Sequence, residues 1–152
     1  MSQFTTNAAT RLLSAALQYA KVQGWRVFPV DPVDGKRPKI GRWQDKATTN
    51  AEQIRKWWQA WPNANIGIAT GERSGIWVLD VDVKDGKPGD ESLSDLEAIH
   101  GELPTTMHAI TGSGGSHYYF KCAEGAQIRN SADSIAPGLD VRGSGGFIVA
   151  PP

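Results

Sequence analysis

The segment of residues 77–83 most constrains the fold of this chain, because it combines the pattern of a buried strand with two carboxylates on one face. Side chains alternate along a strand, so Asp80 and Asp82 point to one side while Leu79 and Val81 point to the other. Two like charges at the end of an apolar strand cost free energy unless a cation lies between them. The pair therefore suggests a site for a hard divalent metal, although a solvated strand end running into a turn explains the same residues.

Length and composition indicate one globular domain spanning residues 1–152. The chain is 39% hydrophobic and contains six tryptophans, as expected of a packed core. It has no apolar run long enough to cross a bilayer and no secretory signal, so we expect a cytoplasmic protein with no membrane partner. The sequence stops directly behind a predicted strand, and we expect a C-terminally truncated fragment of a longer protein. The single cysteine, Cys122, excludes an internal disulfide.

Acidic and basic residues balance. The formal net charge is zero, from 16 basic and 16 acidic residues, which argues against a protein that coats nucleic acid by bulk attraction to phosphates. Basic residues nevertheless collect in one loop that precedes Trp43: Lys36, Arg37, Lys39 and Arg42. This basic loop is either solvated surface or a local path for nucleic acid.

Three segments have apolar residues at helical spacing and stop near a helix-ending residue: residues 12–20 before Gly24, 54–61 before Pro62, and 93–99 before Gly101. A capping-box sequence at residues 49–52 precedes the second. This second helix carries a stripe of tryptophans that could stack nucleobases: Trp57, Trp58 and Trp61. We interpret the stripe as core packing, because apolar residues at this spacing are typical of a buried helix face.

Seven short segments have strand character: residues 25–29, 65–70, 76–83, 107–110, 118–121, 138–142 and 147–150. Only a five-residue turn separates 65–70 from 76–83, so we expect these two to pair as neighbours at the centre of the sheet. The order of elements predicts an α+β domain, with helices early and a mixed or largely antiparallel sheet late.

A glycine turn at residues 111–115 leads into a strand that begins near His117. Backbone amides of such a turn can converge on an anion, but glycine turns are equally common in hairpins. His117 shares a strand face with Tyr119, which suits a histidine that reaches a site. We interpret His100 and His108 as structural.

Asp140 and Arg142 share one face of a later strand, and a second glycine turn follows at residues 143–146. The two side chains can simply pair with each other. Together with Asp80 and Asp82, however, they give three carboxylates and one arginine at strand ends. Two magnesium ions about 4 Å apart, held by such carboxylates, are what in-line displacement at phosphorus requires. No phosphate-binding loop of the Gly-x-x-x-x-Gly-Lys-Ser/Thr type is present.

The ordered set of motifs is more specific than any one of them: residues 24–29, 36–38 with Trp43, 65–71, 79–82, 112–120, 138–143 and the final Ala-Pro-Pro. This set resembles the N-terminal catalytic domain of the bifunctional DNA primase/polymerases, members of the archaeo-eukaryotic primase superfamily that are frequent in phages and plasmids. The resemblance implies an archaeo-eukaryotic primase-like catalytic core, with a sheet of RNA-recognition-motif type, beside an N-terminal α/β unit.

The resemblance also implies roles for individual residues. Asp80 and Asp82 would be the first metal-binding pair, Asp140 the third carboxylate, and His117 a ligand of the nucleotide phosphates. The histidine motif further suggests phosphate contacts by Ser113, Gly115 and Ser116, and we add Arg142 and the basic loop on charge grounds. Relatives often have serine at the position of Gly115, and some have glutamate at that of Asp82.

We therefore expect a template-directed nucleotidyltransferase, a DNA primase/polymerase that uses Mg²⁺ or Mn²⁺ in the replication of a phage, plasmid or similar element. Its expected partners are a single-stranded DNA template, nucleoside triphosphates and a fused or associated helicase. Two alternatives stay open from the residues alone. One is a non-catalytic module that binds nucleotide or single-stranded nucleic acid, and the other is a metal-dependent nuclease.

Overall fold

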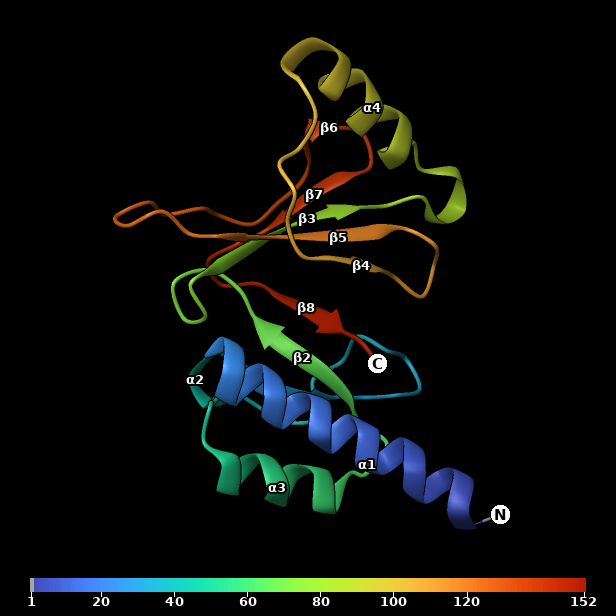
Figure 1. The fold of residues 1–152 in the computed structure, drawn as a ribbon, viewed down its shortest axis with the longest axis vertical. Helices are drawn as coiled ribbons and strands as arrows, with labels where there is room; N and C mark the ends of the chain where they lie inside the picture. Colours follow the sequence, from blue (N-terminus) through green and yellow to red (C-terminus); the bar gives the residue numbers. More distant parts are fainter. Residues whose placement is uncertain (1) are drawn as a thin grey trace. The chain divides into compact units, whose positions relative to one another are not determined.

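The computed structural model describes residues 2–152 and divides into two compact units, each with its own antiparallel sheet (Figure 1). The first unit comprises the chain up to Ala69 together with Phe147–Pro152, and the second comprises Thr70–Gly146. The predicted α+β class with largely antiparallel strands is confirmed. Within residues 2–152, the structure contains no helix with the length and apolar character that crossing a membrane requires.

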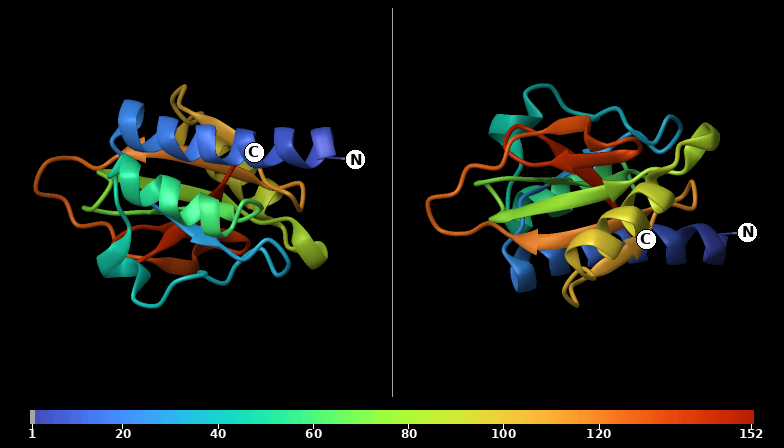
Figure 2. Two further views of the ribbon diagram at one scale, coloured as in Figure 1. Left: turned by 90° about the horizontal axis from the view of Figure 1, so that it is seen from below. Right: turned by 90° about the horizontal axis from the view of Figure 1, so that it is seen from above.

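The first unit combines helices with a small sheet. Its elements are α1 (Ser2–Gln18), a π-helical turn (Tyr19–Gln23), β1 (Val27–Val30), α2 (Trp43–Lys46), α3 (Ala51–Ala60), β2 (Asn65–Ala69) and β8 (Phe147–Ala150). The strands lie in the order β1-β2-β8. Helices α1 and α3 pack against each other, and they lie side by side in the left-hand view of Figure 2.

Helix α3 shows how local sequence determines this unit. The side chain of Asn50 caps the helix by accepting a hydrogen bond from the Gln53 N–H at 3.0 Å, so the cap lies one residue beyond the predicted Thr49. Trp57 and Trp58 are 8% and 3% exposed, which confirms that they are core residues. Trp61, which follows the last residue of the helix, is only partly buried.

The second unit is built around a larger sheet. Its elements are β3 (Ile76–Val81), a 3₁₀ turn (Lys84–Gly86), α4 (Gly89–His100), β4 (His108–Ile110), β5 (Ser116–Lys121), β6 (Ser131–Ala136) and β7 (Leu139–Arg142). The strands lie in the order β4-β5-β3-β7-β6. Helix α4 lies over one face of this sheet, as the right-hand view of Figure 2 shows. There Leu93 packs with Leu79, Val81 and Leu139.

Two expectations about the strands were wrong. Strands β2 and β3 do not pair as a hairpin, because β1 and β8 occupy both edges of β2 while β5 and β7 occupy both edges of β3. Only one isolated bridge, Gly71 to Ile76, closes the turn between them. Strand β6 was missed, because it is a mostly exposed edge strand without apolar alternation.

Candidate active site

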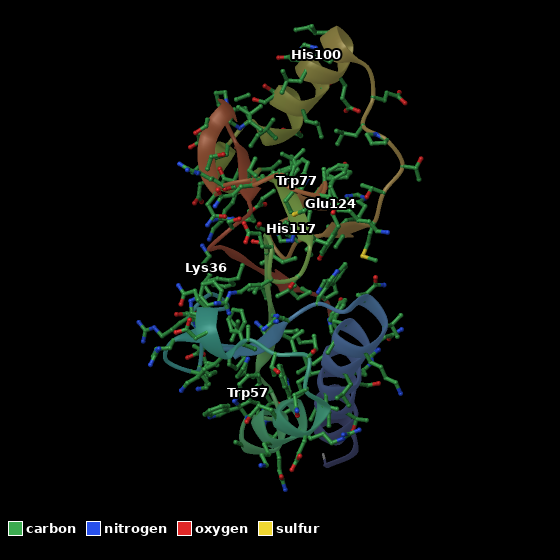
Figure 3. All side chains as sticks on the ribbon, turned by 90° about the vertical axis from the view of Figure 1, so that its left-hand side faces the viewer. Lys36, Trp57, Trp77, His100, His117 and Glu124 are labelled. Carbon is green, nitrogen blue, oxygen red and sulfur yellow. The ribbon has the colours of Figure 1, made fainter. Side chains whose placement is uncertain are left out.

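A row of polar side chains crosses the centre of the five-stranded sheet. Asp80 on β3 lies directly opposite His117 on β5 and also directly opposite Asp140 on β7. Residues directly opposite each other in antiparallel strands project from the same face of the sheet. The three residues therefore form one row, called the polar row below, although they come from three strands. Figure 3 labels His117 within it.

The alternation predicted for β3 explains why this row is polar. Leu79 and Val81 point to the opposite face and are buried against α4, so Asp80 is left on the other side. The row itself is poorly exposed, with His117 at 8% and Asp140 at 7%. Water screens charges only weakly in such surroundings, so each carboxylate needs a cation nearby.

Arg142 supplies that cation for two carboxylates at once. It lies two residues beyond Asp140 on β7 and therefore shares its face. Its Nη2 atom is 3.5 Å from Asp140 Oδ2 and 3.8 Å from Asp80 Oδ2. On the other side of Asp80, His117 Nε2 is 3.4 Å from Oδ1. The expected pairing of Asp140 with Arg142 thus exists, and it also includes Asp80.

Asp82 is engaged differently. It follows the end of β3, and its Oδ1 accepts a hydrogen bond from the Lys84 N–H at 2.9 Å. Its Oδ2 lies 3.7 Å from Lys87 Nζ. The Asp82 carboxylate therefore bonds to residues of the turn after β3. Within residues 2–152, it takes no part in the ion pairs that join Asp80, His117, Asp140 and Arg142.

The backbone of Asp82 is fixed by two neighbouring segments. Its N–H donates to the Gly138 carbonyl at 2.8 Å, and its carbonyl accepts from the Gly89 N–H at 3.0 Å. A Cβ on Gly89 would overlap both carbonyl oxygens, so only glycine lets α4 begin this close to β3 and β7. The close approach holds Asp82 at a defined place beside the start of β7.

Sequence reasoning missed two residues of this region, Lys87 and Asp133. Lys87 Nζ lies 3.7 Å from Asp82 Oδ2 and 3.9 Å from Asp133 Oδ2. The Asp133 N–H donates to Asp140 Oδ1 at 3.0 Å. The sequence around these two residues does not indicate a site. Lys87 lies in a turn whose polar residues predict an exposed loop, and Asp133 lies in the strand that was missed.

The charges of this region leave an excess of negative charge. Four carboxylates face two permanently charged side chains, Arg142 and Lys87. The carboxylates are Asp80, Asp82, Asp133 and Asp140. Apart from any charge on His117, two negative charges remain unbalanced. A divalent cation would neutralise them, and carboxylate oxygen is the ligand that Mg²⁺ prefers.

The donor set fits that metal in part. Within residues 2–152, no group of three His, Cys, Asp or Glu side chains is arranged to hold an ion. Magnesium in phosphoryl-transfer sites, however, is commonly held by one or two carboxylates plus substrate phosphates. Asp80 and Asp140 fit that requirement, because they are direct cross-strand partners and share one Arg142 nitrogen.

Comparison with known families matches residues 16–152 to the family of the N-terminal domain of bifunctional DNA primase/polymerases. The chain belongs to this family. The resemblance seen in the motifs is confirmed, and membership associates this prim-pol domain with DNA primase and polymerase activity in replication. A comparison with curated proteins found none that matches.

The glycine turn before His117 serves the packing of the prim-pol domain. The Gly115 N–H donates to Thr111 Oγ1 at 3.0 Å, so this amide already has a partner within the turn. A Cβ at Gly115 would overlap the Val81 carbonyl oxygen. Ser113 Oγ lies 3.3 Å from Thr111 Oγ1, and Ser116 begins β5 opposite Val81. The two serines therefore lie at the entry to the strand that carries His117.

Several backbone N–H groups of the second glycine turn already donate hydrogen bonds within the protein. Its Gly143 N–H donates to Asn130 Oδ1 at 2.8 Å, and its Ser144 N–H donates to the Ile128 carbonyl at 2.7 Å. The Gly146 N–H donates to the Gly143 carbonyl at 3.0 Å. Two of these amides, those of Gly143 and Ser144, therefore hold the segment before β6 against the turn, and the third closes the turn itself.

The basic loop belongs to the first unit of the prim-pol domain, where Figure 3 labels Lys36. Arg37 Nε lies 3.8 Å from Asp34 Oδ2, and Arg42 Nη2 lies 3.0 Å from Asp45 Oδ2. The Lys39 ammonium lies 5.8 Å from the centroid of the Trp61 ring. Both arginine side chains are more than three-quarters exposed. Exposed ion pairs of this kind are weak, so phosphates can compete for these arginines.

Proposed function

We propose that this prim-pol domain catalyses template-directed nucleotidyl transfer, making a DNA primer or extending one in the replication of a phage, plasmid or similar element. One observation carries the proposal. Asp80 and Asp140 are direct cross-strand partners, with a shared guanidinium on one side and His117 on the other. In this proposal the five-stranded sheet is the core of RNA-recognition-motif type. Helix α4 covers one face of it, and nucleotidyl transfer takes place on the other face.

The carboxylates would hold Mg²⁺ or Mn²⁺ together with the phosphates of the incoming nucleotide. Asp80 and Asp140 are the principal ligands in this proposal. Asp82, just after β3, would join them only by giving up its contact with Lys87. When bound, the metal supplies activation of the attacking 3′-hydroxyl and neutralisation of charge on the triphosphate. The close approach at Gly89 and Gly138 keeps the Asp82 backbone in place.

Cationic and hydrogen-bonding side chains would orient the triphosphate. His117 and Arg142 flank Asp80, so both can contact phosphate oxygens beside the reacting phosphorus. Ser113 and Ser116 can donate hydroxyl hydrogen bonds from the entry to β5, while Gly115 gives the turn its close packing. The 3′-hydroxyl oxygen attacks the α-phosphorus, and pyrophosphate leaves in line.

The template in this proposal is single-stranded DNA. Lys36, Arg37, Lys39 and Arg42 are the residues that we propose for contact with its backbone phosphates. Such contacts are independent of sequence and depend strongly on salt.

The test is primer synthesis and extension on single-stranded template, with each nucleotide set and with Mg²⁺ or Mn²⁺. We expect metal-dependent incorporation that Asp80→Ala or Asp140→Ala abolishes in folded protein. Asp95→Ala is the matched control, because Asp95 is an exposed acid on α4. Full incorporation by either variant would reject the assignment. Strand cleavage without added nucleotides would instead indicate a nuclease, and nucleotide binding that needs no metal would indicate a binding module.

A further inference from the structure

Asp133 has an unusual backbone position beside the polar row. It lies on β6, whose register against β7 shifts between Ser131 and Ala136, so the segment that contains it bulges from the ladder. Its φ is +55°, in the left-handed region that aspartate and asparagine tolerate better than most residues. Because of this bulge, the Asp133 N–H donates to Asp140 Oδ1 at 3.0 Å.

The side chain of Asp133 holds that backbone conformation. Its Oδ1 accepts a hydrogen bond from the Gly138 N–H at 2.7 Å, which closes the turn between β6 and β7. Its Oδ2 lies 3.9 Å from Lys87 Nζ. The carboxylate therefore fastens the bulge to the start of β7 and to the loop after β3.

Lys87 extends this link to the other end of the candidate site. Its ammonium lies between Asp133 and Asp82, at 3.9 Å and 3.7 Å from one carboxylate oxygen of each. The contacts run from Asp140 through the Asp133 N–H, and from the Asp133 carboxylate through Lys87 to Asp82. Carboxylates from two strands are thus connected through residues that lie outside the polar row.

We propose that Asp133 is a positioning residue for Asp140, held in place by Gly138 and Lys87; this inference rests on the proposed function. The Asp133 amide engages Asp140 Oδ1, so Oδ2 is the oxygen directed to the nitrogen shared with Asp80. Magnesium demands nearly ideal octahedral geometry. A carboxylate that is free to rotate would bind it less well.

The test compares three substitutions. Asp133→Ala removes both side-chain contacts, whereas Asp133→Asn keeps an acceptor for Gly138 and tolerates the left-handed backbone. Asp85→Ala is the matched control, because Asp85 is an exposed aspartate that also has φ of +55°. Among residues 2–152, the ion pairs of the polar row do not include Asp85. Thermal unfolding followed by circular dichroism verifies that each variant is folded.

Two measurements are made on each folded variant: Mn²⁺ affinity of the protein alone, by electron paramagnetic resonance, and the kcat and KM of nucleotide incorporation. We expect Asp133→Ala to weaken Mn²⁺ binding about tenfold or more, as loss of a residue that orients a metal ligand typically does. The kcat falls with it, while the KM for the nucleotide changes little. Asp133→Asn lies closer to wild type, and Asp85→Ala matches wild type in both measurements.

The outcomes separate this inference from the proposed function. Equal Mn²⁺ affinity in Asp133→Ala and Asp85→Ala would overturn the inference, while loss of incorporation in Asp140→Ala would still support the function. Suppose that Asp133→Ala binds Mn²⁺ more weakly than wild type, and that the wild-type protein itself incorporates no nucleotide. This pair of results would support the positioning role and reject the proposed function. If Asp133→Ala does not fold, Asp133→Gly decides, because glycine suits the left-handed backbone but also lacks the carboxylate: Mn²⁺ affinity equal to wild type in this variant would overturn the inference.

Discussion

Asp80 and Asp140 are direct cross-strand partners at the centre of the five-stranded sheet, and their Oδ2 atoms lie 3.8 Å and 3.5 Å from the same Arg142 nitrogen. Neither acid is well exposed, with side chains at 21% and 10%. Two such carboxylates repel each other unless a cation is close, so the stability of this sheet and its affinity for metal are coupled through one pair of residues.

Removal of the Arg142 charge tests this coupling. Arg142→Met should destabilise the domain at neutral pH by about 1 kcal/mol, a modest value because the arginine is partly exposed. Added Mg²⁺ should restore more stability to this variant than to wild type, since binding to the folded state adds to its stability. Urea unfolding with and without Mg²⁺ measures both effects. Arg55→Met, on the exposed side of α3, is the control, and an equal response to Mg²⁺ in both variants would contradict the coupling.

His117 should contribute to nucleotide binding. His117→Gln removes the imidazole that lies 3.4 Å from Asp80, and with it a proposed hydrogen bond to phosphate. We expect the KM for the nucleotide to rise about tenfold, since a hydrogen bond to a charged group contributes about 1.5 kcal/mol. His108→Gln is the control, because His108 is exposed and stacks on Tyr118. A changed kcat with an unchanged KM would contradict a phosphate-binding role.

Gly115 should not accept a serine. A Cβ at this position would overlap the Val81 carbonyl oxygen, so Gly115→Ser forces β5 away from the end of β3. We expect a loss of stability of about 2 kcal/mol, typical of overpacking, together with reduced incorporation. Gly112→Ser in the same turn is the control, because no atom lies within 4 Å of a Cβ built there. Chemical unfolding and incorporation assays of both variants check this prediction, which equal stability would refute.

A pH effect is expected in the loop that precedes the basic residues. The Asp34 carboxylate accepts hydrogen bonds from the Lys36 and Arg37 N–H groups, and these lower its pKa below the usual value for an aspartate. A lowered pKa in the folded state means that the contribution to stability is present at neutral pH and is lost as pH falls through the folded-state pKa. Carboxyl NMR titration should place the Asp34 midpoint below that of Asp34 in an unfolded peptide. Equal midpoints would show that the two hydrogen bonds do not hold the loop.

Local pattern predicted those elements whose signals lie within a few residues. The alternation of Asp80 with Leu79 and Val81 gave the polar face of β3, and the tryptophan spacing gave the buried side of α3. Strand β8 agrees with the predicted residues 147–150. In each case burial of one face imposes a periodicity that the sequence records directly.

Pairing between distant segments left no such record. The short turn before Ile76 favoured a hairpin, but the edges of β2 and β3 are taken by strands far away in the chain. Lys87 and Asp133 were missed for the same reason, since their roles arise from a bulge and an ion pair that join separate loops. Asp82 was predicted to share the face of Asp80, but β3 ends at Val81 and the Asp82 carboxylate bonds to the next turn.

The basic loop should contribute to template affinity through charge alone. Lys36→Ala and Lys39→Ala each remove one positive charge, and we expect either to weaken binding of single-stranded DNA to a similar extent for all sequences. The slope of log affinity against log salt concentration should fall by about 1 for each lysine–phosphate interaction that a substitution removes. Fluorescence anisotropy over a range of salt concentrations measures this slope. Lys21→Ala, at the exposed end of the first helical segment, is the control with the same charge change. If all three variants have the wild-type slope, the loop lies outside the DNA path; if Lys21→Ala alone changes it, the template contacts the first helical segment instead.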